Sequence, residues 1–109
     1  MNHYETIVIV QPQLPDAGIS TIQKKIETLV QKYEGTISKW DDWGSRKLSY
    51  KIKKQTSGHY VYILYEAKPQ VVREIENMLN LSEDILKHLT IRRTGGEKNN
   101  EYAHSKESM

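Results

Sequence analysis

The sequence predicts an α+β fold in which two helices cover one face of a four-stranded antiparallel sheet. The expected elements follow the order strand, helix, strand, strand, helix, strand. Right-handed crossovers turn that order into a split βαβ, or ferredoxin-like, sandwich. The first and third strands are central in this topology. They are also the two expected strands with apolar residues at both odd and even positions, which is typical of strands covered on both faces.

The first strand is expected over residues 4–10, where β-branched and aromatic residues dominate. Pro12 and Pro15 end this strand. A helix follows with Asp16 as its N-cap, and Gly35 is its natural stop. Its buried face is predicted from residues at 3.6-residue spacing, namely Ile22, Ile26, Leu29, Val30 and Tyr33.

The second strand is predicted in two parts. Residues 36–40 are extended, and Asp41, Asp42 and Gly44 interrupt them as a β-bulge or bend would. From Lys47 onward apolar and polar residues alternate. We therefore place the apolar set under the helices (Leu48, Tyr50 and Ile52) and the charged set on the open face of the sheet (Lys47, Lys51 and Lys53). Residues 55–58 are expected to form a hairpin loop before the third strand, residues 60–65.

The second helix is expected to begin at Pro69 and to bury Val72, Ile75 and Leu79, with Met78 beside them. Residues 80–84 form a loop, and the last strand spans residues 85–93 with Leu89 and Ile91 on its more apolar side. The domain is thus residues 1–94. The polar segment 95–109 cannot bury enough apolar area to offset its ordering entropy, so we predict a disordered tail.

Composition excludes several classes of protein. The 109 residues suit one domain, and the absence of cysteine excludes disulfides, thiolate metal sites and cysteine nucleophiles. No apolar run reaches membrane-span length and residues 1–15 lack a secretory signal, which predicts a cytoplasmic protein. The four histidines lack metal-ligand spacing, and no Gly-rich phosphate loop or catalytic constellation is present. We therefore expect no enzyme activity, no cofactor and no small-molecule substrate.

The charge pattern is more informative than the net charge of +2. The segment Ser45–Lys54 holds five cations and no acid. On the predicted open face three of these cations, Lys47, Lys51 and Lys53, rim an apolar and aromatic patch, which suits nucleic acid, a partner protein or both. Lysines on an edge strand can also simply prevent aggregation. A regulatory or dimerising ferredoxin-like domain remains the alternative. An acylphosphatase-type enzyme would need an anion-binding Gly-rich loop and an Arg, and residues 11–18 contain no Arg.

Several short motifs resemble one family. They are Tyr4–Glu5 followed by Gln11–Pro12, the closing strand 85–92, and the middle set Gly44, Arg46, Leu48, Tyr50, Ile52, Lys54, Gly58 and Tyr60. Over about residues 3–93 the chain is similar to the bacterial ribosomal small-subunit protein numbered six. One departure is that the family's Ala-Tyr-Pro-Ile motif here reads Ser49-Tyr50-Lys51-Ile52.

The resemblance implies membership of the 30S subunit and binding to the central domain of 16S rRNA together with the small-subunit protein numbered eighteen. Carried onto this chain, it makes Arg46, Lys47, Lys51, Lys53 and Lys54 the candidates for RNA contact. Second-rank RNA candidates lie at the end of the sheet, namely His3, Tyr4, Arg92 and Arg93. The candidates for partner-protein contact are Ile7, Ile9, Tyr60, Tyr62, Leu64 and the tail after Thr94.

Overall fold

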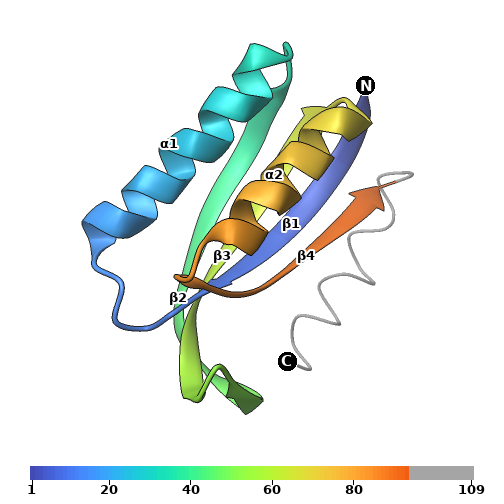
Figure 1. The fold of residues 1–109 in the computed structure, drawn as a ribbon. Coiled ribbons are helices and arrows are strands. Elements are labelled where there is room, and N and C mark those ends of the chain that lie inside the picture. Colours follow the sequence, from blue (N-terminus) through green and yellow to red (C-terminus); the bar gives the residue numbers. More distant parts are fainter. Residues whose placement is uncertain (94–109) are drawn as a thin grey trace.

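The computed structural model of the chain describes residues 1–93, and the six predicted elements occur there in the predicted order (Figure 1). The strands β1 (Asn2–Val10), β2 (Thr36–Ile52), β3 (Gln55–Ala67) and β4 (Ile85–Arg93) form one antiparallel sheet in the order β2-β3-β1-β4. The helices α1 (Asp16–Lys32) and α2 (Pro69–Leu81) both lie on one face of it (Figure 1). β1 and β3 are therefore the central strands, as the sequence predicted.

The main core lies between the helices and the sheet. Even-numbered residues of β1 and odd-numbered residues of β3 face α1 and α2, with Val8 and Ile63 among the most buried. The predicted helix stripes are confirmed by Ile26 and Val30 of α1 and by Val72, Ile75 and Leu79 of α2, and Ile19 and Val71 are buried as well. The Thr6 hydroxyl is a polar group within this apolar layer. It remains hydrogen-bonded there, to the hydroxyls of Tyr65 and Thr90, each at 2.9 Å.

The ends of α1 differ in detail from the prediction. Pro15 is the N-cap, and Asp16 is the first helical residue, where its carboxylate complements the helix dipole. At the other end Glu34, with φ 64°, takes the left-handed position. The Gly35 N–H donates to the Val30 carbonyl at 2.8 Å, which closes a Schellman turn. Gly35 is needed for a different reason than expected, since a Cβ there would lie 2.5 Å from the Glu66 carbonyl oxygen.

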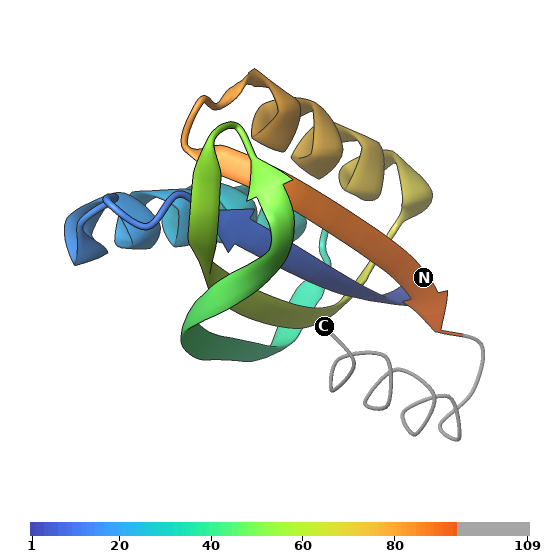
Figure 2. The ribbon, with the colours of Figure 1, turned by 90° about the horizontal axis from the view of Figure 1, so that it is seen from below.

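The largest difference from the prediction lies in the β2–β3 hairpin. Its loop is the two residues Lys53 and Lys54, and the predicted loop at 55–58 is already part of β3. β2 and β3 are therefore long enough to run past the helices as a two-stranded ribbon (Figure 1). Seen from below in Figure 2, this ribbon coils and crosses the end of β1 on the face away from the helices.

Candidate nucleic-acid interface

A β-bulge decides which way the hairpin presents its side chains. The pairing of β2 with β3 shifts between Ile37 and Lys39, between Asp42 and Gly44, and again between Lys47 and Ile52. At the second of these shifts Gly44 has φ +78°. The Asp42 carboxylate accepts the Gly44 N–H at 2.8 Å and contacts His59 Nε2 at 2.6 Å, which fixes the bulge in place. A one-residue shift moves the side chains that follow it to the opposite face of the sheet, up to the next shift in pairing. Before the bulge Trp40 packs against the helix-side core; beyond it Leu48 packs on the other face.

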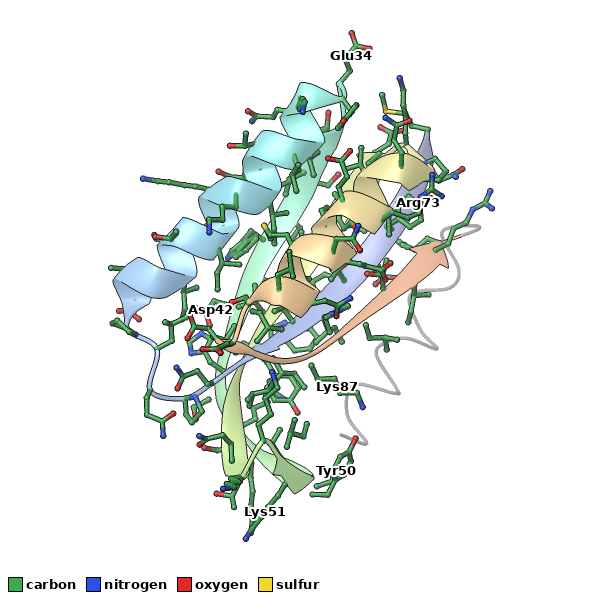
Figure 3. All side chains as sticks on the ribbon, in the orientation of Figure 1. Glu34, Asp42, Tyr50, Lys51, Arg73 and Lys87 are labelled. Carbon is green, nitrogen blue, oxygen red and sulfur yellow. The ribbon has the colours of Figure 1, made fainter. Side chains whose placement is uncertain are left out.

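The faces that we predicted for this part of β2 are therefore wrong. Leu48, which is 8% exposed, and Ile52 pack on the open side of the sheet, and Tyr50 is 61% exposed at the edge of that packing. Lys47 has the opposite parity and is exposed, and Lys51 points away from the molecule (Figure 3). The alternation of apolar and charged residues thus showed that the two sets lie on different faces, but we assigned the apolar set and the charged set to the wrong faces.

The structure separates the five first-rank cations by their surroundings. Arg46 lies over the ring of Trp43, with its guanidinium carbon 5.5 Å from the ring centroid. Lys53 folds back, and its Nζ donates to the Ile85 carbonyl at 2.9 Å. Lys47, Lys51 and Lys54 are exposed, and within residues 1–93 none of them forms an ion pair. These last three ammonium groups are the ones that the fold leaves available to an anion.

The hairpin carries its positive charge without local compensation. From residue 43 to residue 65 the sequence contains no Asp or Glu, and this stretch covers the end of β2, the loop and nearly all of β3. The acids that flank this stretch in sequence are Asp41 and Asp42 before it and Glu66 after it. Asp41 and Asp42 lie at the base of the ribbon, where they bind Trp43 Nε1 and His59. A cationic surface without acids attracts phosphate groups by long-range electrostatics as well as by contact.

The second-rank candidates are not a cluster of free cations. Tyr4 is 6% exposed and packs on Tyr65 under the helices, so it is a core residue and not a surface contact. The side chain of Arg93 is 14% exposed and faces the buried Glu5 carboxylate, with Nε 3.5 Å from Oε1. His3 and Arg92 are exposed at the end of the sheet, where His3 lies 3.6 Å from Glu66 and Arg92 donates to Asn2.

The candidates for partner-protein contact are largely covered by the chain itself. Ile7, Ile9 and Tyr60 lie on the face away from the helices as predicted, but each is at most 5% exposed because the hairpin packs over them. Between hairpin and sheet a cavity of about 150 Å³ remains, lined mainly by those residues, Leu48, Ile52 and Leu89. Its edge is held by Lys87, whose Nζ donates to the Tyr50 hydroxyl at 2.9 Å (Figure 3).

The part of the open face that stays accessible lies nearer to β4. Tyr62 and Leu64 are partly exposed, and Leu89 and Ile91 are 49% and 38% exposed. Together with Tyr50, Leu89 and Ile91 make up three of the five large apolar side chains that are most exposed within residues 1–93. The apolar surface that could meet another protein is therefore shifted toward β4 from where we predicted it. The tail after Thr94 lies outside the described residues.

A buried carboxylate organises this open face, and the sequence analysis did not identify it. Glu5, on the central strand β1, is 2% exposed and accepts a hydrogen bond from the Tyr62 hydroxyl at 2.6 Å. Burial and this hydrogen bond to the Glu5 carboxylate raise the pKa of Tyr62 above its ordinary value. The ring of Tyr62 in turn stacks on Trp43, with centroids 5.3 Å apart and planes 7° apart. A single acid at an odd position of an otherwise apolar strand was the signal available.

Other kinds of site find no support in the described part of the chain. Within residues 1–93 no three His, Asp or Glu side chains gather in a way that could hold a metal ion. None of the helices there is long and apolar enough to cross a membrane.

Comparison with known proteins identifies the family. A model of the family described as Ribosomal protein S6 matches residues 3–92. The chain belongs to this family. The match includes the whole of the sheet except the outermost residues of β1 and β4, together with the bulge, the hairpin and both helices.

Individual S6 proteins agree with this result. Small ribosomal subunit protein bS6 of Gluconobacter oxydans is 40% identical over 89 residues, which are 82% of this chain and 56% of that protein. The protein of the same name from Desulfatibacillum aliphaticivorans is 38% identical over 84% of this chain and 49% of its own length. The chain thus spans about half the length of these relatives, whereas it covers 96% of bS6 from Streptomyces griseus at 37% identity.

A solved structure extends the agreement to three dimensions. The crystal structure of 30S ribosomal protein S6 from Thermotoga maritima superimposes with a TM-score of 0.80 at 28% identity, covering 94% of this chain and 97% of that one. The predicted ferredoxin-like fold and the resemblance on which the family was expected are both confirmed. These S6 relatives are ribosomal proteins of the small subunit and not enzymes, as the sequence predicted.

Proposed function

We propose that this chain is a constituent of the 30S subunit of the cytoplasmic ribosome, where it binds the central domain of 16S rRNA together with the small-subunit protein numbered eighteen and assists assembly. Membership of the S6 family supports the ribosomal role. The observation that supports RNA binding is the part of the β2–β3 hairpin from residue 43 to residue 65, which holds five cations and no acid. This role requires binding and no catalysis.

In this proposal the outer surface of the hairpin meets the RNA backbone. Lys47 has the parity opposite to Leu48, Lys51 points away from the molecule (Figure 3), and Ser45, of the same parity as Lys47, is exposed. Lysines supply salt-dependent attraction to phosphates, and hydroxyls add hydrogen bonds that carry little sequence information. Such contacts recognise the shape of a folded RNA more than its base sequence.

The partner protein meets the opposite side of the hairpin and the β4 half of the open face. Exposed Leu89 and Ile91 continue the surface that Tyr50 begins, and burying them would remove apolar area from water. RNA and partner would then lie on two sides of one hairpin. Each would restrict the hairpin for the other, which gives cooperative binding.

The test is a double substitution, Lys47→Ala with Lys51→Ala, in the full chain. We expect weaker binding to a central-domain fragment of 16S rRNA, and a shallower slope of log affinity against log salt by up to about 0.9 for each phosphate that is no longer bound. Lys24→Ala with Lys25→Ala on the exposed side of α1 removes the same charge and is the matched control. Equal effects of the two pairs would show that only net charge matters and would contradict a hairpin interface.

A second measurement addresses the ribosomal role itself. The full chain should co-sediment with 30S particles and should be released from them at high salt. A chain that binds neither the particles nor the rRNA fragment would refute the proposed function, whereas one that binds both independently of Lys47 and Lys51 would refute only the location of the interface.

A further inference from the structure

The loop of the hairpin holds two lysines in a backbone conformation that favours glycine. Lys53 has φ 50° and Lys54 has φ 69°, and Ile52 pairs with Gln55 across them. Two-residue hairpin loops with positive φ at both positions strongly favour Asn-Gly or Asp-Gly, because a side chain with a Cβ is strained there. A loop of this type with two lysines is therefore less stable than the same loop with Asn-Gly or Asp-Gly.

Only one of the two lysines is explained by contacts within the chain. Lys53 reaches back to β4, where its Nζ donates to the Ile85 carbonyl at 2.9 Å and so ties the loop to the sheet. Lys54 is exposed, and within residues 1–93 its ammonium group has neither a hydrogen bond nor an ion pair. The folded chain thus keeps strain at Lys54 without any compensating interaction of its side chain. Persistent strain of this kind is a reason to look for a function at the residue.

The surroundings of Lys54 indicate the ligand. The loop is the end of the ribbon that projects past both helices, and the neighbouring Lys51 points outward from the same end (Figures 1 and 3). No acid lies between residues 43 and 65 to compete for either ammonium group. Two adjacent cations at a protruding, acid-free tip suit the phosphates of a nucleic-acid backbone, which carries one negative charge per nucleotide.

We propose that the hairpin tip is a phosphate-binding site for RNA, with Lys54 as its central contact, and that the left-handed conformation of Lys54 is retained because it directs the ammonium group toward the RNA backbone. The proposal rests on the proposed function, and it adds a contact point at the tip to the surface formed by Lys47 and Lys51. It also accounts for a loop whose sequence is unfavourable for stability.

The test is Lys54→Gly in the full chain, compared with Lys54→Arg. Glycine relieves the strain and removes the charge, so we expect the melting temperature to rise by roughly 4 °C or more. We also expect affinity for the 16S central-domain fragment to fall several-fold, with a salt slope shallower by about 0.7 to 0.9. Arginine keeps both the charge and the strain, so affinity and melting temperature should stay near those of the unchanged chain.

Each other outcome counts against the proposal. A higher melting temperature with unchanged affinity and slope would show that the tip does not contact RNA, and if Lys47→Ala with Lys51→Ala still weakened binding the proposed function would stand. Increased self-association of Lys54→Gly with unchanged RNA binding would assign the lysine to protection of the hairpin from aggregation. A lower melting temperature would show that Lys54 stabilises the loop and would overturn the argument from strain.

Discussion

Leu48 fixes the position of the hairpin, and its replacement by alanine tests the placement directly. The side chain is 8% exposed and packs with Ile7, Ile9, Tyr60 and Leu86 on the face away from the helices. Leucine-to-alanine substitutions in cores cost about 2–5 kcal/mol. The cavity of about 150 Å³ beside Leu48 means that part of its surface already has no packing partner, which places the destabilisation near 2 kcal/mol, at about the lower end of that range.

A destabilisation of about 2 kcal/mol corresponds to a decrease of roughly 8–16 °C in the melting temperature of a domain this size. Thermal and urea unfolding followed by circular dichroism would measure it. Two double-mutant cycles identify the face on which Leu48 lies. One combines Leu48→Ala with Ile9→Val, and the other combines it with Ile26→Val in α1. Valine is used at the second position because the small change keeps the doubly substituted chains folded.

The two cycles make opposite predictions for the two possible faces. On the observed side, Leu48 and Ile9 share a cluster and should show a coupling energy of about 0.5 kcal/mol or more, whereas Leu48 and Ile26 should be additive within about 0.5 kcal/mol. Coupling to Ile26 and additivity with Ile9 would mean that Leu48 lies under the helices after all. The outward direction of Lys47 and Lys51, and with it the proposed RNA surface, would then be refuted.

Two further predictions concern the buried acid of the open face. Tyr62→Phe keeps the ring on Trp43 but leaves a Glu5 oxygen without its donor, so we expect a decrease of about 1.5–3 kcal/mol in the free energy of unfolding by urea at neutral pH; an unchanged midpoint would mean that Glu5 is solvated. The pKa of Tyr62 is raised in the folded chain above the unfolded-state pKa of 10.0. The contribution of Tyr62 to the free energy of unfolding is therefore fully present below pH 10.0 and is lost as the pH rises beyond it. Stability should therefore fall above about pH 10, less steeply in Tyr62→Phe, although the raised pKa values of Tyr60 and Tyr65 leave a residual decrease; identical slopes for the two proteins would contradict this account.

The fold could be predicted from the sequence because its signals are local and redundant. The apolar spacing that places Ile26 and Val72 in helix stripes, and the doubly apolar strands 4–10 and 60–65, each point to the same topology. The face of the hairpin could not be predicted in this way. It depends on the shifts in pairing at Gly44 and between Lys47 and Ile52, and an alternating pattern looks the same when all its residues move to the opposite face.

The expected exposure of the partner-protein candidates was wrong because it depended on what covers the sheet. We expected Ile7, Ile9 and Tyr60 to be exposed because helices protect only one face of the sheet, yet the chain covers them with its own hairpin. Such long-range packing leaves no periodic signal in the sequence. The bulge itself was visible in Asp41, Asp42 and Gly44.

The bulge also explains why one segment can carry two kinds of contact. Without it, Leu48 would point toward the helices at a level where the ribbon has already passed them, and this apolar side chain would be exposed. With it, Leu48 attaches the ribbon to β1, whereas Lys47 has the opposite parity and Lys51 points away from the molecule (Figure 3). The left-handed Gly44 therefore does more than form a bend. It separates the cationic surface proposed for RNA from the apolar surface proposed for the partner.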